Sequence, residues 1–352
     1  MQAFMNISES DTGLYIDVGS TSVKFASKKD RGAIPFPPPV TKGEIFEVET
    51  QPIVEIIRKL IGMHEECRDI FFSVQMHGYV LSSRKNRYVS WRDRRCGQAQ
   101  FEALLAKYGD YIGANSGTAS KRNLPVYSIL SDWERGNDIG EEFYSLGSYI
   151  AYSLTGNNCS HASDLCASGF YLRNGALNID LLQALPFRLR LPRCEREVVP
   201  CGTYCGKRVY VPIGDQQCSV FGVCMADSVI LNVGTAAQLC CVADYAEQGK
   251  FENRPYFDGA TLCTVTGLYG GGTIMERYAD PSFRKEVLRQ YRESLTLLPH
   301  RNNLLCCGGA FDHYGEFLYG LARELGYEPK RANSDALQGL QAISGRYVCK
   351  KR

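Results

Sequence analysis

The chain has 352 residues, 44% of them hydrophobic and 22% charged, which is typical of a globular protein long enough for two domains. Lys and Arg number 40 against 38 Asp and Glu, and a formal charge of only +2 excludes the strongly basic proteins that bind nucleic acid or acidic membranes. The first residues lack the basic and apolar regions of a secretion signal, and no window has the apolar length of a membrane span. We therefore expect a cytoplasmic protein without nucleic-acid or membrane partners.

The spacing of apolar residues predicts mixed α/β structure from the start of the chain. Strands are expected at residues 14–18, 23–27 and 70–74, with a helix over 52–64 and a proline-rich surface loop over 32–43. Helical patterns then dominate residues 96–185, with breaks near 109–117 and 156–163. The mixture of strands and helices implies a parallel α/β core.

A second strand-rich passage begins near residue 209. Strands are expected at 209–213, 229–233, 238–243, 261–266 and 303–307, and helices at 281–298, 314–325 and 334–343.

Fifteen cysteines are spread along the chain, and without a secretion signal we expect them to be reduced. The densest group is Cys194, Cys201 and Cys205, but no C-x-x-C pair occurs and the five histidines show no ligand spacing beside it. The neighbours Cys240 and Cys241 would point to opposite faces of a strand. Small core residues are the expected role of the cysteines, and no metal site is expected among them.

Two stretches share one pattern, "IDVGSTSVKFAS" at residues 16–27 and "ILNVGTAAQLC" at 230–240. In each, an apolar strand ends in Asp or Asn, a V-G-[ST] turn follows, and a second apolar strand begins. Glycine N–H groups and hydroxyls in such turns can hold phosphate, and two copies predict an internal duplication that grips one polyphosphate from both sides. A Walker loop would need G-K-[ST], which is absent. One copy alone would be an ordinary small-residue turn.

Between the two copies lies "VPIGDQQCSVFG", residues 211–222. A strand runs into Gly214 and Asp215, and a helix is expected to start at Gln216. This puts a carboxylate at a strand end, where α/β folds bind their ligands. The alternative role of Asp215 is that of a helix N-cap.

Several segments, in order, resemble motifs of the FGGY carbohydrate kinases of the actin/hexokinase/Hsp70 superfamily, with the sedoheptulokinase and xylulokinase subfamilies most similar. They are "DVGSTSVK", "VQMHGYVL", "SWRDRRC", "SHASDLCASGFYLRN", "GDQQ", "NVGTAAQL", "TVTGLYGGGTIM" and "LLCCGGAFDHYGEFLYGLARELG". The resemblance implies a duplicated ribonuclease-H-like α/β fold with a nucleotide cleft between two domains. Residues 13–226 would form the sugar-binding and first-phosphate domain, and 227–346 a shortened nucleotide-binding domain.

The resemblance also implies ATP- and Mg²⁺-dependent phosphorylation of a sugar hydroxyl, with a ketose (heptulose or pentulose) as substrate. Asp215 would be the general base, and Asp17 and Asp215 would hold Mg²⁺ through water. The residues implied to bind ATP and its phosphates are Gly19, Ser20, Thr21, Ser22, Lys24, Gly234, Thr235, Gly308 and Gly309. Those implied to bind the sugar are Gln75, Met76, His77, Asp93, Arg94 and Asp215.

Plainer roles stay open for some of these residues. Lys24 would equally be a solvated charge, His77 a hydrogen-bonded core histidine, and Trp91 either a stacking surface for sugar or a core residue. The glycine pairs would also serve turn geometry alone. Asp164 is expected to belong to a structural turn.

The passage "IMERYADPSFRK" joins the glycine-rich segment almost directly to the region beyond it, so part of the second domain is expected to be missing. That shortening favours an alternative, a catalytically weak regulatory protein that binds sugar or nucleotide. The presence of both Asp17 and Asp215 argues against this alternative. An Hsp70- or actin-like ATPase would leave "VQMHG" and "WRDRR" unexplained. The oligomeric state stays open.

Overall fold

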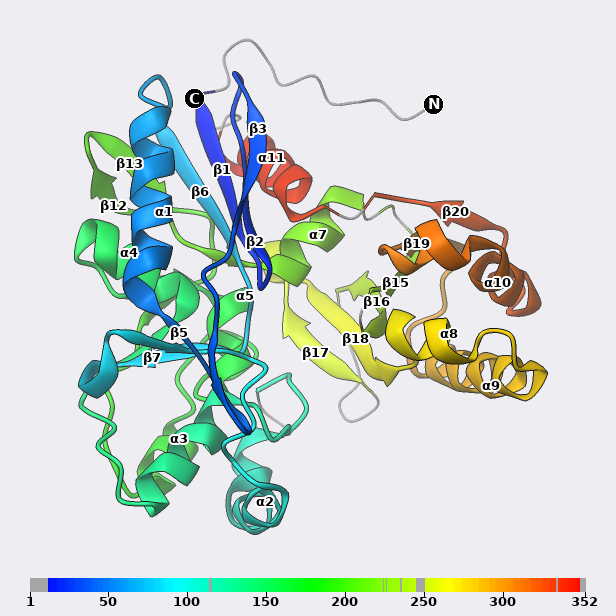
Figure 1. Ribbon diagram of the computed structural model, residues 1–352, viewed down its shortest axis with the longest axis horizontal. Coiled ribbons are helices and arrows are strands. Elements are labelled where there is room, and N and C mark those ends of the chain that lie inside the picture. Colours follow the sequence, from blue (N-terminus) through cyan, green and yellow to red (C-terminus); the bar gives the residue numbers. More distant parts are fainter. Residues whose placement is uncertain are drawn as a thin grey trace.

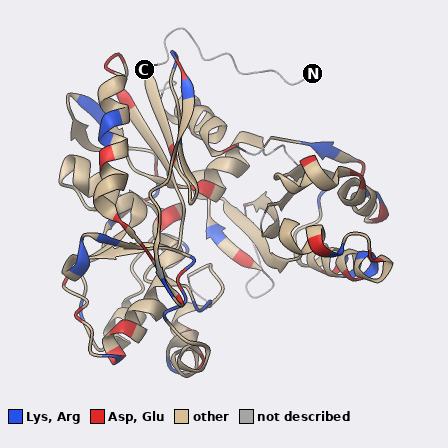
Figure 2. Cartoon of the chain, viewed as in Figure 1, with Lys and Arg blue, Asp and Glu red and all other residues tan. Residues whose placement is uncertain are grey.

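A computed structural model describes residues 12–113, 116–223, 225, 227–234, 236–244, 251–333 and 335–348. The chain forms two lobes, with the blue to green N-terminal part on one side and the yellow to orange part on the other (Figure 1). Charges of both signs are interspersed over both lobes (Figure 2), as the balanced composition predicts.

The N-terminal lobe is built on a seven-stranded sheet of order β12-β13-β6-β1-β2-β3, with β14 also paired to β6. Its strands are β1 (Gly13–Val18), β2 (Ser22–Ala26), β3 (Arg31–Pro35), β6 (Asp69–Val74), β12 (Pro200–Tyr204), β13 (Lys207–Tyr210) and β14 (Ile213–Gly214). Every residue of β1 and β6 is buried, as in a sheet covered on both faces. Helices α1 (Thr50–Met63) and α4 (Leu146–Thr155) contribute to the apolar cluster on one face.

A second, five-stranded sheet of order β4-β5-β8-β7-β9 lies beneath this one in Figure 1. Its strands are β4 (Val40–Lys42), β5 (Ile45–Glu49), β7 (Tyr79–Leu81), β8 (Arg87–Val89) and β9 (Phe143–Ser145). The remaining elements of this lobe are α2 (Gln98–Ile112), α3 (Pro125–Glu134), α5 (Ala162–Leu165), α6 (Ile179–Ala184), the paired strands β10 (Cys159–His161) and β11 (Arg193–Glu195), and the 3₁₀ turns Ser82–Arg84 and Cys166–Ser168.

The C-terminal lobe is a six-stranded sheet of order β17-β18-β16-β15-β19-β20. Its strands are β15 (Ser228–Val233), β16 (Ala237–Ala243), β17 (Glu252–Pro255), β18 (Thr261–Leu268), β19 (Asn303–Cys307) and β20 (Pro329–Arg331), with a 3₁₀ turn at Phe257–Gly259. Helices α8 (Gly271–Arg277), α9 (Pro281–Leu297) and α10 (Ala310–Glu324) pack on this sheet through a shared apolar cluster.

The two lobes repeat one arrangement. Strand β1 forms an antiparallel hairpin with β2 and pairs in parallel with β6, and β15 does the same with β16 and β19. The neighbouring strands β3 and β18 then extend each hairpin antiparallel. The duplication expected from the two V-G-[ST] motifs is therefore present in the strand order.

Helix α11 (Ala336–Tyr347) returns to the N-terminal lobe, although we expected residues 227–346 to form one C-terminal domain. It packs on α7 (Asp215–Val223), and its apolar side chains share a cluster with Tyr15 and Phe71 of the first sheet. A Cβ at Gly339 would lie 1.7 Å from the carbonyl oxygen of Cys218, so the close crossing of the two helices requires glycine there. The last helix therefore connects the lobes.

Most predicted elements are present within a few residues of their expected bounds. The expectation of a loop over 32–43 is wrong in part, because β3 and β4 lie within or overlap that stretch; both are sheet-edge strands, where proline is tolerated. No disulfide joins the described cysteines, and Cys240 and Cys241 belong to different apolar clusters, as strand alternation predicts. Within the described residues no helix is long and apolar enough to cross a membrane, and no group of three or more His, Cys, Asp and Glu side chains is placed to hold a metal ion.

Candidate active site

The first phosphate-type turn joins β1 to β2. The N–H of Gly19 donates to the carbonyl oxygen of Ser22 at 3.1 Å, and the carbonyl of Thr21 accepts from the N–H of Phe36 at 3.0 Å. The hydroxyl of Ser20 lies 3.5 Å from the guanidinium of Arg92. These bonds hold a compact turn whose tip, Thr21, is exposed.

Two carboxylates stand at neighbouring strand ends beside this turn. Strand β6 runs between β1 and β14, with Asp17 paired to Ser73 on one side and Gly214 paired to Val74 on the other. Asp215 follows Gly214 directly and begins α7. The strand pairing therefore brings Asp17 and Asp215 together, although they are far apart in the sequence.

Burial raises the pKa of Asp17 to about 6, with the charge of Lys24, 3.9 Å away, acting in the opposite direction. Burial also raises the pKa of Asp215 to about 7, and the charge of Asp17 adds to that rise. Two ionised carboxylates in this position repel each other, so a proton or a cation is favoured between them.

This donor set fits Mg²⁺, which binds carboxylate oxygens together with water. Oδ1 of Asp17 is buried and has no hydrogen-bond partner among the described residues. Lys24 lies 3.9 Å from the carboxylate of Asp17, and half of its side chain is exposed. Both a phosphate-binding role and the role of a solvated charge therefore stay open for Lys24.

The segment after β6 carries the polar groups that we expected for sugar. Gln75 is buried, its Nε2 donates to the carbonyl of Gly19 at 3.2 Å, and its Oε1 has no partner among the described residues. Met76 is also buried, and a Cβ at Gly214 would lie 2.7 Å from its sulfur. Gln75 therefore links the first phosphate turn to the candidate sugar site.

His77 has a φ of +64°, a strained conformation for a residue with a Cβ. Its Nδ1 lies 2.9 Å from the carbonyl oxygen of Ala167; since a carbonyl only accepts, Nδ1 carries the hydrogen and Nε2 is left as an acceptor. Burial lowers the pKa of His77 to about 3, and the nearby charges of Arg254 and Lys121 lower it further. At neutral pH His77 is an uncharged hydrogen-bonding group.

Asp93 has a different environment from the one we expected. Its carboxylate accepts from the N–H of Phe46 at 2.7 Å and from the N–H and Nε of Arg95 at 2.9 and 2.8 Å. Arg95 in turn donates to Asp132 and Glu47. Both oxygens of Asp93 are thus engaged in a buried ion-pair network, and a sugar-binding role for this carboxylate gains no support.

Arg94 lies in the same segment and is half-buried. Its Nη1 donates to the carbonyl oxygens of Trp91 and Asp93, each at 3.0 Å. The neighbouring Asn123 also donates to the carbonyl of Trp91, at 2.7 Å. These contacts fix the backbone around Trp91.

Glycine turns of the C-terminal lobe lie close together, at the positions that the sequence predicted to bind nucleotide. Gly308 follows β19 with a φ of +95°, and a Cβ there would lie 2.3 Å from the carbonyl oxygen of Val233. Gly271, at the start of α8, donates its N–H to the carbonyl of Gly234 at 2.7 Å. Gly309 has open space around its Cα. Thr235, predicted to bind phosphate, lies outside the described residues.

Sequence reasoning missed the charged strand β17. Glu252 and Arg254 face the same way and are almost fully buried, and Arg254 donates to the side chain of Gln216, the residue after Asp215. Lys121, from the segment before α3, contacts the other oxygen of Glu252 at 2.5 Å. The short string "ENRP" shows no clear alternation of apolar and polar residues, so nothing in it predicted a strand beside the site.

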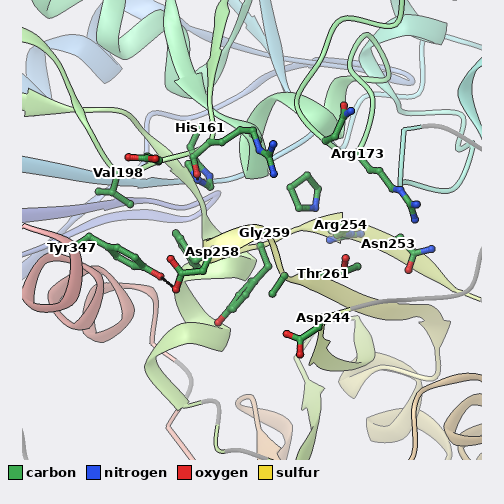
Figure 3. A pocket seen from close by; sticks show the side chains of 18 residues that line it. His161, Arg173, Val198, Asp244, Asn253, Arg254, Asp258, Gly259, Thr261 and Tyr347 are labelled. Carbon is green, nitrogen blue, oxygen red and sulfur yellow. Dashed lines mark hydrogen bonds between the residues drawn. The ribbon is translucent and has the colours of Figure 1, made fainter.

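A cavity of about 740 Å³ lies beside β17 (Figure 3). Its wall combines residues of the N-terminal lobe, such as His161 and Arg173, with Asn253, Asp258 and Tyr347 from later in the chain. None of the site residues that the sequence predicted lines it, so this cavity is separate from the candidate active site.

No protein-family model and no curated protein matches the sequence. The fold does match solved structures. A ligand-bound xylulose kinase from Lactobacillus acidophilus matches with a TM-score of 0.82 and 13% identity over 96% of this chain and 90% of that chain. This chain has the fold of carbohydrate kinases.

Two further kinases extend the match. Gluconate kinase from Lactobacillus acidophilus matches with a TM-score of 0.77 and 13% identity, over 94% of this chain and 89% of that chain. Glycerol kinase from Plasmodium falciparum with ADP matches with a TM-score of 0.74 and 13% identity, over 94% and 88%. The carbohydrate-kinase fold confirms the expected two-domain arrangement of the actin/hexokinase type and agrees with the resemblance to FGGY kinases.

Proposed function

We propose that the chain is an ATP-dependent carbohydrate kinase that transfers the γ-phosphoryl group of ATP to a hydroxyl of a sugar, with a ketose as the preferred acceptor. The observation that carries the proposal is the convergence of Asp17 and Asp215 beside the β1–β2 turn. It is supported by the fold, whose solved examples phosphorylate xylulose, gluconate and glycerol according to their names. The ketose preference rests on the sequence resemblance.

Asp215 is the proposed general base. Its Oδ1 accepts the N–H of Gln216 at 2.8 Å, which orients the carboxylate at the start of α7. Phosphoryl transfer passes through a loose transition state, so the sugar hydroxyl loses its proton late and needs a nearby acceptor rather than a strong base. A pKa of about 7 suits such a group near neutral pH.

Asp17 and Asp215 are the residues that would hold Mg²⁺ through water. The bound ion would neutralise charge on the phosphates of ATP. Asp17 contributes an oxygen without a protein partner, and its own pKa of about 6 leaves it mostly ionised at neutral pH.

The sugar would be oriented by Oε1 of Gln75 and Nε2 of His77. Both atoms accept hydrogen bonds, which suits the hydroxyl donors of a sugar. With a pKa near 3, neutral His77 is a much weaker base than Asp215, whose pKa is about 7, so it does not compete for the role of base. Arg94 is hydrogen-bonded to the backbone around Trp91. Its assignment to the sugar site rests on the sequence resemblance alone, and there its guanidinium would donate hydrogen bonds.

The phosphates of ATP would lie between the turn at Gly19 to Ser22 and the glycine turns of the C-terminal lobe. Backbone N–H groups in these turns need no side-chain movement to bind an anion. Glycine is needed at position 308 for a steric reason, because a Cβ there would clash with the carbonyl oxygen of Val233. This requirement is compatible with a second role of Gly308 in nucleotide binding.

The test is sugar-dependent ADP release by the purified protein with Mg²⁺ and ATP, over pentuloses, heptuloses, polyols and gluconate. We expect a ketose to give the highest kcat/KM and Asp215→Ala to abolish release while ATP binding, followed by calorimetry, persists. ATP binding with no ADP release on any sugar would refute the kinase and favour the catalytically weak binding protein.

A further inference from the structure

A buried ion pair on strand β17 faces the proposed base. Arg254 donates from Nε to Oε2 of Glu252 at 2.8 Å and from Nη2 to the same oxygen at 2.5 Å. Both residues are at most 7% exposed. Alternation along a strand puts Glu252 and Arg254 on one face and Asn253 on the other. Figure 3 labels Arg254 and Asn253 on this strand, beside the separate cavity.

The third contact of Arg254 reaches the active-site helix. Its Nη1 donates to Oε1 of Gln216. The Nε2 of Gln216 donates to Gln238 at 3.2 Å and to the hydroxyl of Thr264 at 3.3 Å. Strands β16, β17 and β18 of the C-terminal sheet therefore all hold the side chain of Gln216, whose backbone N–H holds Asp215.

Glu252 is also bound from the other lobe. Lys121, which precedes α3, lies 2.5 Å from Oε1 of Glu252 and donates to the hydroxyl of Thr266 at 3.2 Å. Burial alone would raise the pKa of Glu252, but Arg254 and Lys121 outweigh it and hold the pKa at about 2. The carboxylate stays ionised and joins the two lobes at the sugar side of the site.

The charged groups around Asp215 come from three elements. Asp17 of β1 and Asp164 of α5 raise the pKa of Asp215, and Arg254 of β17 lowers it. Asp164 accepts hydrogen bonds from Ser145 and Ser160, which fix the orientation of its carboxylate. Arg254 is thus the cation that opposes the two carboxylates.

We propose that Arg254 is a positioning residue for phosphoryl transfer: held by Glu252, which Lys121 also binds, it fixes Gln216, whose N–H orients the base Asp215. This inference rests on the proposed kinase function. A planar guanidinium can bind Glu252 and Gln216 at once, whereas a lysine ammonium keeps the charge without the forked geometry. Charge and geometry can therefore be tested separately.

The test compares Arg254→Met and Arg254→Lys with the wild type in sugar-dependent ADP release. For Arg254→Met we expect kcat to fall by about tenfold or more, since a misoriented base transfers the proton less well, with the KM for ATP little changed. Arg254→Lys keeps the positive charge without the forked geometry, so its kcat should also stay low. A kcat of Arg254→Lys equal to that of the wild type would overturn the positioning role of the guanidinium.

Arg289→Met is the matched control, because Arg289 pairs with Glu293 on the surface of α9, with both side chains well exposed. It should leave kcat unchanged. Since Arg254→Met leaves Glu252 buried with one partner fewer, the double variant Arg254→Met/Glu252→Gln removes both charges and protects the fold. Wild-type kcat in the double variant would overturn the proposal.

The chemical shift of the Gln216 backbone N–H, which bonds to Asp215, can be followed by NMR in the full chain at one fixed pH and needs no turnover, so it separates this proposal from the kinase function. It should change in Arg254→Met and stay unchanged in Arg289→Met. A wild type that releases no ADP on any sugar would refute the kinase function alone. A Gln216 N–H shift that is the same in Arg254→Met and the wild type would refute the role of Arg254, whatever the activity.

Discussion

Replacing Asp215 by Asn should make the protein more stable and inactive at the same time. The pKa of Asp215 rises from its ordinary value of 3.8 to about 7, chiefly through burial and then through the charge of Asp17. The folded chain therefore binds an additional proton between about pH 4 and 7, and the free energy of unfolding falls as the pH rises through that window. Above it, the ionised carboxylate destabilises the fold by up to about 4 kcal/mol.

The carboxamide of Asn has nearly the same shape, carries no charge, and can still accept the N–H of Gln216 through its oxygen. We expect Asp215→Asn to raise the free energy of unfolding at pH 8 by about 2 to 4 kcal/mol, the lower figure allowing for the part of Asp215 that water reaches. At pH 4.5 the folded wild type keeps the proton on Asp215 while the unfolded chain has begun to lose it, so the difference should shrink to about 1 kcal/mol.

The assay is urea unfolding at both pH values without divalent cations, with Asp110→Asn, an exposed position on α2, as the control. Adding Mg²⁺ at pH 8 should stabilise the wild type more than Asp215→Asn, because a cation relieves the repulsion between the two carboxylates. A variant no more stable than the wild type at pH 8, or a gain that is the same at both pH values, would refute the reasoning.

Three further predictions concern Gly308, His77 and Leu340. Gly308→Ala should lower the free energy of unfolding by about 1 to 3 kcal/mol and weaken ATP binding in calorimetry. The reasons are the positive φ of Gly308 and the close approach of a Cβ there to Val233. A Cβ at Gly309 would lie in open space, so Gly309→Ala should leave stability nearly unchanged. His77 should show no protonation by NMR between pH 5 and 8, since burial lowers its pKa to about 3, and His77→Phe should raise the KM for sugar more than that for ATP. Leu340→Ala, in the fully buried face of α11, should cost about 2 to 5 kcal/mol in urea unfolding.

Each of these has a contrary outcome. Equal stability of Gly308→Ala and Gly309→Ala would contradict the steric argument at Gly308. A His77 resonance that titrates near pH 6.5 would show that its ring is solvated. A change below about 1 kcal/mol for Leu340→Ala would mean that α11 does not pack as described.

Local sequence patterns predicted much of the fold. The two V-G-[ST] hairpins, the buried strand β6 and the helix over 281–297 follow from apolar spacing and small-residue turns, which act within about ten residues. The carboxylate at the start of α7 could also be predicted, because a strand that ends in Gly-Asp before a helix is a local signal. The strand within the proline-rich stretch was missed, because edge strands tolerate proline and carry little apolar signal.

The site needed contacts between distant segments. Asp93 carries the residue type expected of a sugar ligand, yet Arg95 and Phe46 occupy its oxygens, which only folding could decide. Burial raises the pKa values of Asp17 and Asp215, and the charge of Asp17, brought close across β6, raises that of Asp215 further; neither effect exists in the unfolded chain.

The sequence by itself determined the duplicated strand–turn–strand units, the order of the motifs and the identity of the candidate base, because each depends on residues that are neighbours in the chain. Only the tertiary structure decided that α11 closes back on α7, and that Arg254, Glu252 and Lys121 meet Gln216 beside the base. The physical reason is that a buried charge is stable only beside a partner of opposite charge. Lys121 and Glu252, which form such a pair, are separated by about 130 residues in the chain.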